Sequence, residues 1–140
     1  MAFTGNFTCN TFKTGLMNGT FNFTSGSFYL ALYTNSAALN EDTTAYTATG
    51  EASGGNYVAG GNLLTIAQVP TVGNGDTAYI SFNNTSWTGA ITARGALIYL
   101  RGGGNPAVCV LDFGADKTST ATFTVQFPAV TNTSAIIRIS

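Results

Sequence analysis

The chain has 140 residues, a formal net charge of -1 and charged side chains at only 8% of its positions. This length suits a single domain, residues 1–140, with a buried core. No stretch is basic, which argues against nucleic-acid binding, because phosphate contacts depend on clustered lysine and arginine. Histidine is absent, so the commonest general base and neutral metal ligand are missing. We therefore expect a protein that is not an enzyme, with no catalytic residue, metal or cofactor.

The N-terminal region predicts neither a signal peptide nor a membrane anchor. It has no basic segment followed by an apolar run, and no apolar run in the chain reaches the length of a membrane span. Residues 1–8 contain two aromatic side chains in a polar, extended-looking stretch. We interpret them as a short N-terminal arm whose Phe3 and Phe7 contact a partner protein.

One short helix and a first strand follow the arm. Asn10 or Thr11 is expected to cap the helix, and Gly19 is expected to end it. Residues 27–34 alternate apolar side chains in the pattern of a β-strand. Residues 35–55 are polar and too long for an ordinary turn, so we expect a functional or interfacial excursion.

The rest of the chain alternates short apolar runs with turn signals. Turns are predicted at Asn74 and Gly75, at Asn83 and Asn84, and over residues 114–118. The strands predicted between these turns cover residues 57–68, 77–82, 92–100, 106–113, 122–127 and 135–139. This pattern is typical of an all-β fold, a two-sheet antiparallel β-sandwich of the jelly-roll or immunoglobulin-like kind, with one short N-terminal helix.

Residues 92–113 predict a long hairpin whose tip is the glycine-rich turn at residues 101–105. Both strands of this hairpin are apolar on both faces. Because a strand facing water alternates polar and apolar residues, these strands are expected to be covered on both sides, by the second sheet or by another subunit.

Two charges lie within the apolar strands of this hairpin. If the strands pair from Leu100 opposite Pro106, Arg94 faces Asp112 across the hairpin. A buried arginine needs a partner, since an unpaired buried charge is costly. We therefore predict that Arg94 and Asp112 form a structural ion pair rather than a catalytic one.

The cysteines and the single tryptophan leave alternatives open. Cys9 and Cys109 permit one disulfide, but their spacing does not establish that they pair. Trp87 is expected in the core or at its rim. A sugar-binding surface would instead require Trp87 exposed on one platform with tyrosines such as Tyr46 or Tyr57.

Several motifs in order along the chain resemble a family of small proteins encoded by tailed bacteriophages. The resemblance covers nearly the whole sequence and is carried by residues 12–23, 28–34, 43–46, 50–54, 92–99 and 111–117. None of these motifs is a catalytic signature. The cysteines and the glycine-rich tip at residues 101–105 depart from the family pattern.

This resemblance implies a virion structural protein, and within the virion a capsid decoration or cement protein. Such a protein is expected to form trimers on the outer capsid surface and to bind the major capsid protein and neighbouring copies of itself. It would be made in the host cytoplasm. The alternatives are a tail-associated fibre or adaptor module and a carbohydrate-binding module.

Overall fold

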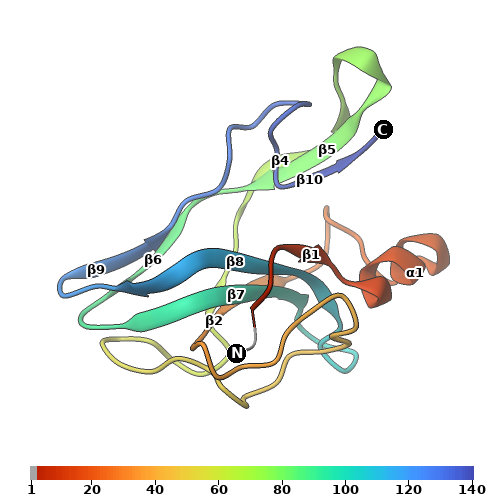
Figure 1. Cartoon of the computed structure of the whole chain (residues 1–140). Helices are drawn as coiled ribbons and strands as arrows, with labels where there is room; N and C mark the ends of the chain where they lie inside the picture. Colours follow the sequence, from red (N-terminus) through yellow and green to blue (C-terminus); the bar gives the residue numbers. More distant parts are fainter. Residues whose placement is uncertain (1–2) are drawn as a thin grey trace.

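The computed structural model describes residues 3–140 and is mostly β-structure, with antiparallel sheets and one α-helix (Figure 1). Within this part of the chain, no helix is long and apolar enough to cross a membrane. The elements are β1 Phe7–Thr8, α1 Asn10–Asn18, β2 Phe28–Tyr33, β3 Asn62–Leu63, β4 Ile66–Val72, the 3-10 turn η1 Asn74–Asp76, β5 Ala78–Phe82, β6 Thr85–Thr88, β7 Thr92–Leu100, β8 Ala107–Thr118, β9 Thr122–Val125 and β10 Ile137–Ile139. The mostly-β prediction with one short helix is confirmed.

The strands form one large sheet and two smaller ones. The large sheet has the order β1-β8-β7-β2-β3, a three-stranded sheet has the order β10-β5-β4, and β6 pairs with β9. The turn predicted at Asn83 and Asn84 is wrong, because β5 and β6 follow each other without pairing together. Asn83 donates its backbone N–H to the Thr65 carbonyl at 2.9 Å, and the Asn84 side chain accepts from the backbone of Phe127 at 2.8 Å. Asn83 and Asn84 therefore lie in an extended stretch that connects β5 of the three-stranded sheet to β6 of the two-stranded sheet.

The main core lies between the large sheet and the smaller sheets. Leu30 and Ile98 of the large sheet belong to the same buried cluster as Phe82 of β5 and Trp87 of β6. Aromatic rings fill one end of this core, where Phe12, Phe21, Phe23 and Phe28 contact one another. Burial of these large rings supplies much of the apolar area removed from water on folding.

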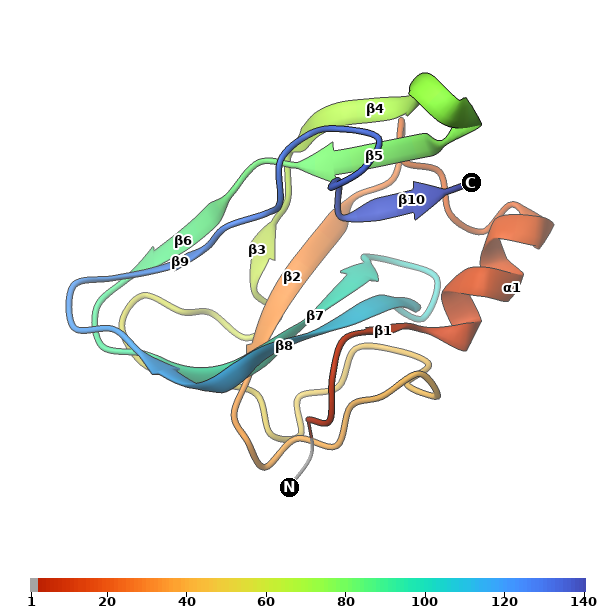
Figure 2. The same cartoon turned by 45° about the horizontal axis from the view of Figure 1, so that its top comes forward.

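The opposite face of the large sheet carries a second buried cluster. Its members from the sheet include Tyr33, Leu97 and Tyr99, and Leu39 packs on them from the excursion after β2. Figure 2 shows this excursion on the side of the sheet away from β4 and β5. The central hairpin is thus covered on both faces as predicted, and the second cover is the chain's own loop within this structure.

The N-terminal arm is part of the sheet and not a free extension. Phe7–Thr8 pair with β8, and the Asn6 side chain accepts a backbone hydrogen bond from β8 at 2.6 Å. Phe3 is 1% exposed and lies against Gly95, where a Cβ atom would overlap its ring. The interpretation of Phe3 as a partner contact is therefore wrong, because this ring fills the chain's own second cluster, and Phe7 is half-buried beside it. The first two residues of the predicted arm lie outside the described part of the chain.

Candidate functional site

Arg94 and Asp112 form a direct ion pair in the large sheet. Arg94 Nε lies 2.8 Å from Asp112 Oδ1, and the two side chains are 15% and 10% exposed. The same carboxylate oxygen accepts the backbone N–H of Gly114 at 2.9 Å. The hydrogen bond from Arg94 holds the pKa of Asp112 below its ordinary value. Both charges are satisfied inside the fold, which indicates a structural role.

The register that brings this pair together differs from the predicted one. Near the hairpin tip the strands pair as expected, but Val108 is an extra residue in β8 and shifts the register by one. Asp112 therefore lies opposite Gly95, with Arg94 at a second irregularity beside it. The turn predicted at residues 114–118 is also wrong. Gly114, with φ of 85°, belongs instead to a bulge within β8.

A cluster of tyrosines around Glu51 fixes the excursion onto the large sheet. The Glu51 carboxylate accepts hydrogen bonds from Tyr46 and Tyr57, both at 2.6 Å, and from the backbone N–H of Gly60 at 2.7 Å. Tyr99 of β7 donates to the Gly60 carbonyl at 2.7 Å. Burial, followed by the hydrogen bond to Glu51, raises the pKa of Tyr46 and of Tyr57. The sequence analysis missed this cluster, for which the only signal was one acid between two tyrosines.

Trp87 does not lie on an exposed platform. Its side chain is 2% exposed, and its ring lies 5.4 Å from that of Tyr57, centroid to centroid. The Tyr57 hydroxyl is occupied by Glu51 and also accepts the backbone N–H of Leu32. This confirms the core position predicted for Trp87 and removes the aromatic surface that a sugar-binding role requires.

The two cysteines lie beside the pairing of β1 with β8, but they are not bonded to each other. Cys9 and Cys109 are both free and buried. Burial raises the pKa of the Cys9 thiol to about 11 and that of Cys109 to about 12. Both thiols therefore remain protonated at neutral pH and behave as small apolar groups.

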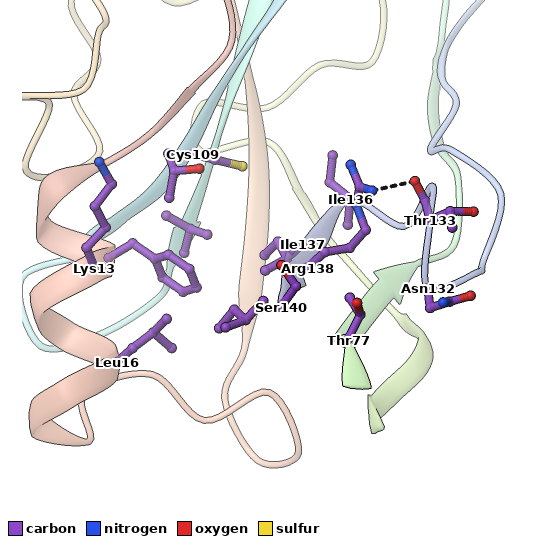
Figure 3. Close-up of a pocket in the computed structure, with 14 residues that line it drawn as sticks. Lys13, Leu16, Thr77, Cys109, Asn132, Thr133, Ile136, Ile137, Arg138 and Ser140 are labelled. Atoms are coloured by element: carbon purple, nitrogen blue, oxygen red, sulfur yellow. Dashed lines mark hydrogen bonds between the residues drawn. The ribbon is translucent and has the colours of Figure 1, made fainter. Parts of the chain in front are cut away.

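A concave surface lies between α1 and β10, and we call it the α1–β10 groove (Figure 3). It has a volume of about 690 Å³. One wall is helix α1, the floor is formed by β1 and β8, and the other wall is β10 with the turn before it. The lining residues are Thr8, Phe12, Lys13, Leu16, Thr77, Val108, Cys109, Asn132, Thr133, Ile136, Ile137, Arg138, Ile139 and Ser140.

Two further hollows share walls with this groove. One, of about 380 Å³, is lined mainly by apolar residues and exposes the core edge at Phe21 and Phe23. The other, of about 320 Å³, runs beside β1 at Phe7–Thr8 and past Ala135. Together they follow β10 along its length. Residues of the main core therefore line this groove, where Phe12 is 3% exposed and Cys109 is 8% exposed.

Local sequence explains where α1, one wall of the groove, begins and ends. Cys9, in an extended conformation, precedes the helix without a side-chain cap, so the predicted cap at Asn10 or Thr11 is wrong by one or two positions. Gly19, with φ of 79°, ends the helix as predicted. The Phe21 ring packs on Gly15, where a Cβ atom would overlap it. A glycine inside the helix thus lets the following loop fold back onto it.

The described residues form no group of three or more acids, cysteines or histidines placed to hold a metal ion. Comparison of the chain with protein-family models, with curated proteins and with solved structures finds no match.

Proposed function

We propose that this chain is a virion structural protein of a tailed bacteriophage, and that it acts as a non-enzymatic decoration or cement protein on the outer capsid surface. Its partners are the major capsid protein and neighbouring copies of itself in a trimer. We also infer that its sheets pack as a two-sheet β-sandwich of the jelly-roll or immunoglobulin-like kind. The observation that carries the proposal is the α1–β10 groove, an opening of the core beside an unpaired strand edge.

Surface composition supports a docking role. Charged residues are rare, so few charges keep neighbouring molecules apart. Large apolar side chains that are exposed include Met17, Val58, Leu63, Val69, Val72 and Ile139. A subunit that makes several weak contacts at once gains strength through multivalency, which suits a shell of many copies.

The site chemistry supports a structural role over catalysis. Arg94 and Asp112 pair with each other, and the Glu51 carboxylate accepts three hydrogen bonds from within the chain. A tail-associated fibre or adaptor module uses the same kind of docking surface, and it remains the second candidate. The burial of Trp87 weighs against the carbohydrate-binding alternative.

The test is to add the purified protein to phage particles that lack it and to locate bound copies by electron cryomicroscopy. We expect density repeated over the icosahedral shell, with a trimer as the repeating unit. Density confined to the tail vertex would replace the decoration role with the tail-associated one. Absence of bound density anywhere on the particles would overturn the virion proposal.

A further inference from the structure

The free edge of β10 restricts what can occupy the α1–β10 groove. β10 ends the three-stranded sheet and, among the described residues 3–140, pairs only with β5, so the backbone N–H and C=O groups on its other side have no strand partner there. An extended segment that adds beside β10 would satisfy these groups. The walls at Phe12, Leu16 and Ile137 are apolar and would receive alternate side chains of such a segment. The backbone geometry therefore favours an extended strand with apolar side chains.

The cationic side chains of the groove favour an occupant with acidic residues. Lys13 and Arg138, two of the chain's five cationic side chains, line the groove, while no aspartate or glutamate side chain lines it or either adjoining hollow. Figure 3 shows them on opposite walls. Lys13 Nζ donates to Asn10 Oδ1 at 3.2 Å, and Arg138 donates to the Thr133 carbonyl. Neither cation pairs with a carboxylate within residues 3–140. An occupant with acidic residues would complement both walls.

Within residues 3–140 of a second copy, no strand with a free edge supplies such a segment. Arg138 is the middle residue of β10, so a two-fold pairing of β10 with itself would bring two guanidinium groups together. The other described strands with a free edge are β1, β3, β4, β6 and β9. None of them contains aspartate or glutamate. Charge complementarity therefore favours a different protein as the occupant.

We propose that the α1–β10 groove binds an extended, apolar segment with acidic residues from another protein, which adds to β10 as a further strand. The placement of that protein in a virion rests on the proposed function, whereas the chemistry of the groove does not. The bound segment completes the core where this chain leaves it open.

The probe is a synthetic peptide in which valines alternate with threonine and aspartate. Its binding to the full chain is measured by fluorescence anisotropy, and hydrogen exchange locates the protected amides. We expect binding together with slower exchange in β10 at Ile137–Ile139. A peptide with lysine in place of aspartate is expected to bind about tenfold more weakly. A peptide with methylated backbone amides, which cannot pair with a strand, is expected not to bind.

Charge reversal on the protein gives the matched test. The double variant Lys13→Glu with Arg138→Glu should weaken binding of the aspartate peptide about tenfold and improve binding of the lysine peptide. Lys117→Glu, which changes a cation far from the groove at the other end of the hairpin, should leave both affinities unchanged. Leu16→Glu provides a second groove variant on the exposed side of α1 in case the double variant unfolds, and circular dichroism checks that each variant is folded.

The outcomes separate this proposal from the proposed function. Failure of the aspartate peptide to bind, or binding that ignores both charge reversal and backbone methylation, would overturn the groove proposal. Protection of β10 that rises with protein concentration in the absence of peptide would overturn it in favour of self-association. Peptide binding without attachment to phage particles would leave the groove proposal standing and remove the virion assignment. Attachment to particles that the double variant retains in full would keep the virion assignment and show that the groove is not the surface that contacts the particle.

Discussion

The two faces of the fold differ in how their apolar side chains are covered. On the outer face of the large sheet, the chain folds its own excursion and N-terminal arm over Tyr33, Leu97 and Tyr99. At the α1–β10 groove, the core at Phe12 and Ile137 meets an open hollow. The chain therefore covers the first surface with its own segments, whereas the second borders a hollow. Under the groove proposal, a segment of another protein covers this second surface.

The largest effect on stability is expected from removing a side chain that covers the outer face of the large sheet. Phe3→Ala should lower the free energy of unfolding by about 3–5 kcal/mol, because a fully buried ring is lost and leaves a cavity above Gly95. Urea denaturation followed by circular dichroism measures the change. Met17→Ala on α1, where the side chain is 84% exposed, is the control and should change stability by less than about 0.5 kcal/mol. Equal, small effects at both positions would show that the arm is not part of the stable fold.

A smaller effect on stability is expected where hydrogen bonds, and not apolar burial, hold the excursion against the large sheet. Glu51→Gln keeps the side-chain shape but loses a charged acceptor for Tyr46, Tyr57 and Gly60. We expect a loss of about 1–3 kcal/mol in the free energy of unfolding. Glu41→Gln, on an exposed part of the same excursion, is the matched control and should be close to neutral. A neutral Glu51→Gln would show that tyrosine packing alone holds the excursion.

The sequence predicted the strands of the fold better than the segments that pack over the large sheet. The central hairpin, its tip and the strand before the excursion follow from apolar runs and turn residues that act locally. Burial of Phe3 and the cluster around Glu51 depend on contacts between segments far apart in the chain, for which periodicity holds no signal. The register at Arg94 failed for the same reason, because the bulge at Val108 depends on packing across the sheet. The groove was missed because it needs the relative positions of α1 and β10.

The Arg94–Asp112 pair sharpens the comparison through its pH dependence. The pKa of Asp112 is lower in the folded chain than its ordinary value, so folding favours the ionised carboxylate. The stabilisation from this pair is therefore complete above the unfolded pKa of about 3.9 and is lost as the pH falls through the lower folded value. Asp112→Asn should lower the urea midpoint at pH 7 by less than Glu51→Gln does, and should flatten the loss of stability below pH of about 4. An acid profile identical to that of the unsubstituted chain would assign the pH dependence to other carboxylates.

The smallest expected effect on stability, but the most direct comparison of the two surfaces, concerns the cysteines. Cys9 is 0% exposed, whereas Cys109 is 8% exposed and lines the groove. Because burial raises both thiol pKa values, labelling by a thiol reagent at pH 8 should be at least about a hundredfold slower than in the urea-denatured chain. Measured in the single variants Cys9→Ser and Cys109→Ser, the remaining Cys109 should label faster than the remaining Cys9, and only Cys109 should be slowed further by the aspartate peptide. Equal labelling rates for the two cysteines, unchanged by the peptide, would mean that the floor of the groove is as closed as the covered face. The two surfaces would then differ only in the side chains at the rim of the groove.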